Sequence, residues 1–138
     1  MEPPLFLLVD DDPDDIMLLK EAIHSLDKNI EFAEAKDGRA ALTFLKEAKL
    51  NGRLPGLIVL DINMPILNGR EAMALIKKED QLKQIPLVIF STSSYPTDII
   101  YCREHGVELI VKPFEMKVLM EVAKKLVKTY ATHRANSM

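Results

Sequence analysis

The sequence predicts a doubly wound α/β fold, with five parallel strands in one sheet and helices on both of its faces. Short, mostly apolar runs alternate five times with segments in which apolar residues recur at helical spacing. The runs Leu5–Val9, Leu57–Leu60 and Leu87–Phe90 are apolar throughout, which is typical of strands buried on both faces of a parallel sheet. Alternating strands and helices indicate right-handed crossovers, which put helices on either side of the sheet.

The first strand, Leu5–Val9, runs directly into three consecutive acids, Asp10 to Asp12. Asp12 is a suitable N-cap for a helix, and Pro13 suits the first helical position. The acids of the first turn, Asp14 and Asp15, favour the positive end of the helix dipole, and we assign them and Asp12 to that purpose. The residues expected to face the core recur at helical spacing: Ile16, Leu19, Ile23 and Leu26.

The second strand, Ile30–Ala35, is less apolar and is therefore expected nearer the edge of the sheet. Asp37-Gly38 begins a second helix, which Asn51-Gly52 ends. The third strand, Leu57–Leu60, is entered through a proline-glycine turn and stops at a carboxylate, Asp61. Asp61 therefore lies at the carboxyl edge of the sheet, where open α/β sheets bind their ligands.

A third helix is expected from Gly69 to about Asp80, with Ala72, Met73 and Ile76 facing inward. The fourth strand, Leu87–Phe90, ends in a run of hydroxyl residues from Ser91 to Ser94. A fourth helix starts at Thr97 or one residue earlier, and Gly106 closes it in a left-handed conformation.

The fifth strand, Val107–Val111, ends in Lys112-Pro113. The last helix is expected from about Glu115 to Tyr130, with Val118, Leu119, Val122 and Leu126 facing inward. The chain thus reads as one domain with a core over residues about 5–130, and the tail 131–138 is expected to fray. Of the common strand orders we choose 2-1-3-4-5, because it places strands one and three, which both end in acids, side by side at the switch point.

These strand ends bring acids, a hydroxyl and a lysine to one edge of the sheet. Carboxylates of Asp10, Asp11 and Asp61 about 5 Å apart would repel by about 3 kcal/mol per pair at an effective dielectric of about 20. Either some of them are protonated or a cation lies among them. Oxygen ligands with room for water suit Mg²⁺. Lys112 adds a positive charge and Ser91 a hydrogen-bond donor, so the site could hold a phosphoryl group against Asp61 as the nucleophile.

The sequence resembles the receiver domains of two-component response regulators over nearly its whole length. The resemblance rests on several motifs in order: Val9-Asp10-Asp11, Leu60-Asp61 with Met64-Pro65 and Gly69, Ser91 after the fourth strand, and Lys112-Pro113-Phe114. It implies a flavodoxin-like (βα)5 receiver fold of the stand-alone type. It also implies that Asp61 accepts a phosphoryl group from a phosphohistidine on a sensor histidine kinase or phosphotransfer protein.

The resemblance also implies roles for the surrounding residues. Asp10, Asp11, Asp61 and the backbone carbonyl of Asn63 would serve Mg²⁺. Ser91 would be the switch hydroxyl, and Lys112, before a cis Pro113, would hold the phosphoryl oxygens. The family often has an aromatic residue three positions before this lysine, where Leu109 stands here. The long segment Glu47–Pro55 is similar to that of stand-alone receivers paired with phytochrome-type kinases.

Composition excludes several other classes of protein. The net charge of −3 and the lack of a basic arm argue against nucleic-acid binding. The apolar runs are too short to span a membrane, and the N-terminus does not resemble a signal peptide. The single cysteine, Cys102, fits a reducing compartment, so we expect a cytoplasmic protein.

Two alternatives stay open, and neither requires a different fold. A phosphatase that forms an aspartyl phosphate would need a general acid two residues after the nucleophile, where Asn63 stands. We therefore expect a phosphoacceptor that assists its own phosphorylation and dephosphorylation, rather than an enzyme acting on external esters. The second alternative is a receiver that acts as a docking surface without phosphate.

Four successive apolar residues in the fourth helix, Ile99 to Cys102, indicate where a signal could leave the domain. On a helix they point in four directions, so at least one of Ile100 and Tyr101 is expected to be exposed. Tyr95 and Leu109 could extend this patch. We expect the face formed by the fourth helix and fifth strand to bind a downstream protein or a second copy of the chain when Asp61 is phosphorylated.

Overall fold

The computed structural model describes residues 2–92 and 95–136 and contains the five strands and five helices in alternation. In chain order they are β1 (Leu5–Val9), α1 (Pro13–His24), β2 (Glu31–Ala35), α2 (Gly38–Asn51), β3 (Leu57–Leu60), α3 (Gly69–Lys78), β4 (Leu87–Ser91), α4 (Pro96–Glu104), β5 (Glu108–Val111) and α5 (Met116–Asn136). All strand pairs are parallel and the order is β2-β1-β3-β4-β5, as the sequence predicted.

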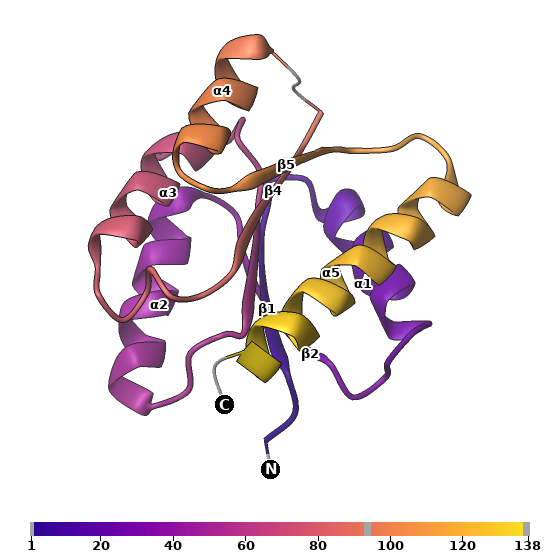
Figure 1. Cartoon of the computed structure of the whole chain (residues 1–138), viewed down its shortest axis with the longest axis horizontal. Coiled ribbons are helices and arrows are strands. Elements are labelled where there is room, and N and C mark those ends of the chain that lie inside the picture. The colour runs from indigo at the N-terminus through magenta and orange to yellow at the C-terminus, as the bar shows by residue number, and fades with distance from the viewer. Residues whose placement is uncertain (1, 93–94, 137–138) are drawn as a thin grey trace.

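The helices cover the two faces of the sheet unequally (Figure 1). Helices α1 and α5 lie on one face, and α2, α3 and α4 lie on the other. Because successive strand residues point to opposite faces, β1 divides its side chains between two cores. Leu7 and Val9 pack with α2 and α3, while Phe6 and Leu8 pack with α1 and α5. The central strands are therefore rigidly held, and their carboxyl ends make a fixed platform.

The helix boundaries follow from local capping. The Asp12 side chain accepts hydrogen bonds from the N–H groups of Asp14 and Asp15, and Asp37 accepts one from Ala40 N–H. Gly106 follows α4 with a positive φ of 67°, which is the left-handed conformation predicted for it. These expected helix ends are confirmed.

Two residues predicted to face the core are exposed instead, Leu26 and Val118. Helix α1 ends at His24, so Leu26 lies beyond the helix and outside its apolar stripe. Val118 lies in the first turn of α5, whose buried residues begin at Leu119.

The predicted end of the last helix at Tyr130 is wrong, because α5 continues to Asn136. Tyr130 packs against Phe6, with 5.4 Å between ring centroids, and Arg134 Nη1 donates a hydrogen bond to its hydroxyl. These contacts hold the helix where fraying was expected, and residues 137 and 138 lie outside the described part of the chain. No helix in the described ranges is both long and apolar enough to cross a membrane.

Candidate functional site

The residues singled out at the strand ends meet at the carboxyl edge of the sheet. Asp10 follows β1 and Asp61 follows β3, and the pairing of Val9 with Leu60 puts these two acids side by side. Ser91 is the last residue of β4 and is fully buried. Its carbonyl oxygen accepts a hydrogen bond of 2.9 Å from Lys112 N–H, which fixes the backbone where Lys112 leaves β5.

Lys112 is the electrostatic centre of this site. Its Nζ lies 2.6 Å from Asp10 Oδ2, 2.8 Å from Asp15 Oδ2 and 3.4 Å from Asp61 Oδ2. Burial by itself lowers the pKa of this ammonium, but the hydrogen bonds to Asp10 and Asp15 and the charges of Asp61 and Asp10 raise it above its ordinary value. Lys112 is therefore permanently charged at physiological pH.

The sequence predicts only a helix-dipole role for Asp15, and its ion pair with Lys112 is a contact that the sequence analysis does not predict. A usable signal was present in the helical phase. Asp15 lies one turn before Leu19, and residues four apart share a face of a helix. Because Leu19 is buried against the sheet, Asp15 faces the sheet edge, whereas Asp14 is exposed to solvent.

The pKa of the Asp10 carboxyl is raised, which means that its charged form is unfavourable in this site. Burial raises the pKa of this carboxyl to about 6, against the hydrogen bonds from Lys112 and from Asp12 N–H, which lower it. The charge of Asp61 raises it further. Lys112 therefore compensates the buried charge of Asp10 only in part.

Asp61 is only 6% exposed, and its Oδ1 has no hydrogen-bond partner among the described residues. The loop after it is fixed by a close approach of backbone to backbone. A Cβ on Gly69 would lie 2.1 Å from the carbonyl oxygen of Asp61, so only glycine fits there. Asn68 and Glu71 form a capping box that starts α3 at this point. The carboxylate is thus presented from a rigid support.

A divalent cation fits the acids at this edge. Asp10, Asp11 and Asp61 each offer a carboxylate oxygen, and the three oxygens lie within 4.8 Å of one another. Asp10 and Asp61 are buried and Asp11 is exposed, which leaves a side open to solvent for water ligands. A buried oxygen without a hydrogen-bond partner, as in Asp61, and a raised pKa, as in Asp10, are both expected of carboxylates that bind a cation.

Three further expectations have different outcomes. The peptide bond before Pro113 is trans and not cis, and trans is the intrinsically favoured form even before proline. Asn63 lies in the loop after β3, but the role of its carbonyl as a metal ligand stays a prediction. Ser93 and Ser94 of the hydroxyl run lie outside the described residues.

The family model for the response regulator receiver domain matches residues 6–124. The response regulator Rcp1 of Synechocystis sp. is 38% identical over 100 residues, which cover 71% of this chain and 68% of that protein.

Two solved structures are also similar. One is the phosphorylated cyanobacterial phytochrome response regulator RcpA, with a TM-score of 0.85, 32% identity and coverage of 94% of each chain. The other is the Mn²⁺-bound form of response regulator Rcp1, with a TM-score of 0.78 and 32% identity over 89% of this chain and 91% of that one. On sequence, fold and the placement of its acids, the chain belongs to the response regulator receiver domains of two-component signalling systems.

Proposed function

We propose that Asp61 accepts a phosphoryl group from a phosphohistidine of a sensor histidine kinase or phosphotransfer protein. The observation that carries this proposal is the buried Asp61 carboxylate, with one oxygen unpartnered and the other facing the Lys112 ammonium. In the transfer, an Asp61 oxygen forms a bond to phosphorus as the phosphorus–nitrogen bond of the donor breaks. The imidazole leaves with that electron pair.

The neighbouring residues supply what this transfer needs. Lys112 lies where it can donate hydrogen bonds to the phosphoryl oxygens, and it neutralises charge without losing its own proton. Ser91 lies at the end of the neighbouring strand, where its hydroxyl can donate to another of those oxygens. Mg²⁺, held by Asp10, Asp11, Asp61 and the Asn63 carbonyl, would offset the negative charge shared by the acids and the phosphoryl group.

The proposal is tested by intact-mass measurement after incubation with acetyl phosphate. We expect the mass to rise by one phosphoryl group in the presence of Mg²⁺ and to stay unchanged when EDTA replaces it. A protein that gains no mass under either condition would instead support the alternative of a phosphate-independent docking domain.

Asp11→Ala is expected to weaken Mg²⁺ binding about 10-fold or more, because it removes one of the three carboxylates of the predicted cation site. Calorimetric titration with Mg²⁺ measures the dissociation constant directly. Asp14→Ala is the matched control, since it removes an exposed acid a few residues away and outside the cluster. Equal Mg²⁺ affinity in the wild type and Asp11→Ala would show that Asp11 is not a ligand.

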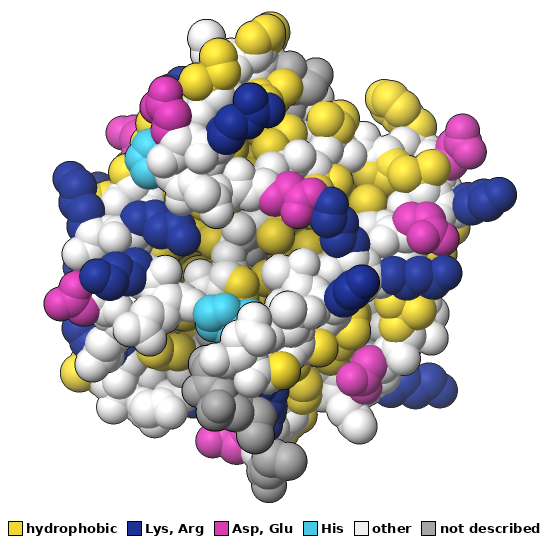
Figure 2. Space-filling model, viewed as in Figure 1, with side chains coloured by type: hydrophobic (Ala, Val, Ile, Leu, Met, Phe, Trp, Pro, Cys, Tyr) yellow, Lys and Arg dark blue, Asp and Glu magenta, His cyan; other side chains and the backbone are white. Residues whose placement is uncertain are grey.

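For the output we propose the face formed by α4 and β5, which binds either a downstream protein or a second copy of the chain. Exposed apolar side chains on this face include Tyr95, Ile100 and Val111. Figure 2 shows hydrophobic side chains among charged ones over α4 and β5. Ile100, at 53% exposure, is the residue that projects from the helix, as expected for at least one of Ile100 and Tyr101.

Tyr101 has a different position, against the first turn of α3. The guanidinium of Arg70 lies 4.1 Å from the centre of the Tyr101 ring, and the Tyr101 hydroxyl donates a hydrogen bond of 3.3 Å to the Arg70 carbonyl. Arg70 also lies 3.7 Å from Asp98 of α4. Because the buried residues of α4 are only Asp98 and Cys102, these polar contacts carry much of its attachment. If the Ser91 hydroxyl moved toward the phosphoryl group, α4 could therefore shift with it and lose little buried apolar surface.

Ile100→Glu is expected to abolish any change in assembly or partner binding that follows phosphorylation, while leaving phosphorylation of Asp61 intact. A charge on an apolar contact surface would have to be desolvated in the complex. Sedimentation velocity and kinase pull-down, each with and without a phosphoryl mimic, measure the effect. Leu50→Glu is the control, because Leu50 is 86% exposed on α2, away from this face. If both variants respond to the mimic as the wild type does, this face is not the output.

We further propose a cytoplasmic location and a phytochrome-type partner kinase. The buried, unpaired Cys102 accords with a reducing compartment, and the likeness to RcpA supports the kinase class. The segment Glu47–Pro55 is not one long connection. Residues 47–51 belong to α2, so the connection between α2 and β3 is short.

A further inference from the structure

The Lys112 ammonium has three N–H donors and three carboxylate partners, so its hydrogen-bonding capacity is fully used. Its distances to these partners are unequal. Asp10 and Asp15 lie within 2.8 Å, and Asp61 lies at 3.4 Å. A phosphoryl oxygen on Asp61 can therefore reach Lys112 only by replacing one of the present acceptors.

During the proposed phosphoryl transfer, two of the three carboxylates that accept hydrogen bonds from Lys112 have other roles. Asp10 and Asp61 belong to the group of oxygens that fits a cation, and Asp61 also forms the bond to phosphorus. Asp15 is not in that group. It nevertheless lines the same cavity of about 10 Å³ as Asp10 and Asp61, beneath the edge of the sheet. Of the three carboxylates, Asp15 is thus the one that can remain hydrogen-bonded to Lys112 throughout the reaction.

We propose that Asp15 is a positioning residue for Lys112. It would hold the ammonium beside Asp61 when Asp10 serves as a cation ligand, so that a donor N–H is already in place as negative charge develops on the phosphoryl oxygens. Lysine has a long, flexible side chain, and fixing it in advance saves the cost of ordering it during the transfer. This inference rests on the proposed function of Asp61 and Lys112. Asp15 itself forms and breaks no bond to phosphorus.

The adjacent Asp14 offers a control in the same helical turn. Asp14 and Asp15 both follow the Asp12 cap, and both donate their N–H groups to it. Asn at either position removes one negative charge at the same end of the helix dipole. Of the two, only Asp15 pairs with Lys112. A difference between Asp15→Asn and Asp14→Asn therefore reports the ion pair and not the general loss of charge.

The first measurement is the rate of phosphorylation by acetyl phosphate at saturating Mg²⁺, as a function of donor concentration. Both variants should lower the half-saturating concentration of this anionic donor to a similar extent, because each removes a negative charge near the site. Asp15→Asn should in addition lower the maximal rate about 10-fold, the scale of effect seen when a supporting residue is lost. Asp14→Asn should leave the maximal rate unchanged. Asp15→Glu keeps the charge and should restore most of the rate.

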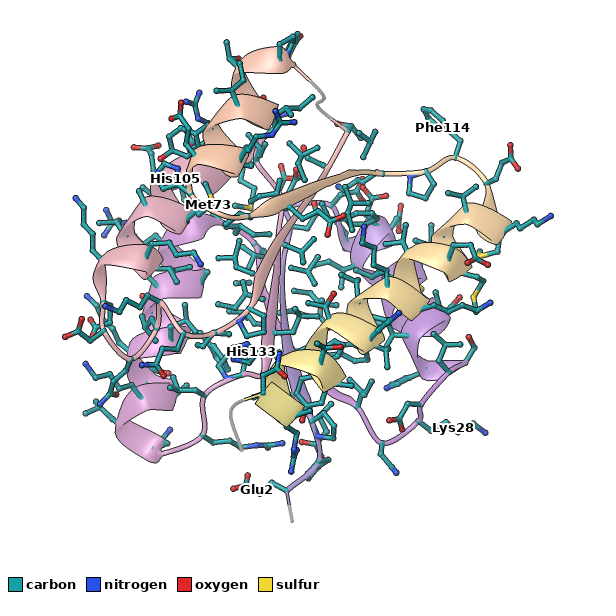
Figure 3. The ribbon with its side chains drawn as sticks, viewed as in Figure 1. Glu2, Lys28, Met73, His105, Phe114 and His133 are labelled. Atoms are coloured by element: carbon teal, nitrogen blue, oxygen red, sulfur yellow. The ribbon has the colours of Figure 1, made fainter. Side chains whose placement is uncertain are left out.

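The second measurement needs neither metal nor phosphate. Reductive methylation of lysines in EDTA, followed by peptide mass spectrometry, reports how readily each amine is freed. Lys112 should react severalfold faster in Asp15→Asn than in Asp14→Asn, while exposed Lys28 serves as the internal standard in both (Figure 3).

The outcomes separate the inference from the proposed function. If the wild type is phosphorylated on Asp61 but the two Asn variants share one maximal rate and one Lys112 reactivity, the positioning role of Asp15 is wrong and the proposed function stands. If the wild type takes up no phosphoryl group, both are wrong. A reduced maximal rate that Asp15→Glu does not restore would assign Asp15 a steric role in place of the ion pair.

Discussion

Asp10→Asn is expected to raise the free energy of unfolding of the metal-free protein at neutral pH by up to about 3 kcal/mol. Burial raises the pKa of Asp10 from 3.8 to about 6 in the folded state, and each pKa unit corresponds to about 1.4 kcal/mol. The ionised carboxylate therefore destabilises the fold at pH 7. Asn has nearly the same shape without the charge, although it pairs less well with Lys112.

The pH dependence of stability follows from the same shift. Because the folded state binds this proton more tightly than the unfolded state, the contribution of Asp10 to stability is complete below pH 4 and is lost as the pH rises through 6. Urea unfolding at a series of pH values in EDTA should show this loss in the wild type and in the control Asp14→Asn, but not in Asp10→Asn. If Asp10→Asn were less stable than the wild type at pH 7, the claim that the ionised Asp10 carboxylate destabilises the fold would be contradicted.

Most of the fold could be predicted from the sequence because its signals are local and agree with one another. The unbroken apolar runs of β1, β3 and β4 indicated buried parallel strands. The strand order depended on placing β1 beside β3, and the pairing of Val9 with Leu60 confirms it. The end of α5 could not be predicted in this way, because its last turns are held by Tyr130 against Phe6, a contact between opposite ends of the chain.

The sequence predicts which residues meet at the site, but not which acids form ion pairs with Lys112. Strand ends converge on one edge of a parallel sheet, so Asp10, Asp61 and Lys112 could be brought together from sequence alone. The ion pair of Asp15 with Lys112, beside the closer one of Asp10, depends on side-chain reach and on the phase of α1, so the convergence of the strand ends does not predict it. The full exposure of the Phe114 side chain could not be predicted either, because it depends on the course of the loop after Lys112 (Figure 3).

Asp61→Asn is expected to keep the fold and to abolish phosphorylation. Asn fills the same buried space at the end of β3, so the packing of the loop against Gly69 is retained. An amide oxygen is a far weaker nucleophile than a carboxylate, and the variant also removes one oxygen from the predicted cation site. Asp80→Asn is the control, because Asp80 is an exposed acid outside the site.

The most direct test of the central claim is therefore to locate the phosphoryl group. After incubation with acetyl phosphate and Mg²⁺, the protein is digested and its peptides are mapped by mass spectrometry. We expect a single phosphoryl group on the peptide that contains Asp61, present in the wild type and Asp80→Asn and absent from Asp61→Asn. A phosphoryl group on any other peptide, or modification of Asp61→Asn at the wild-type rate, would contradict the assignment of Asp61 as the acceptor.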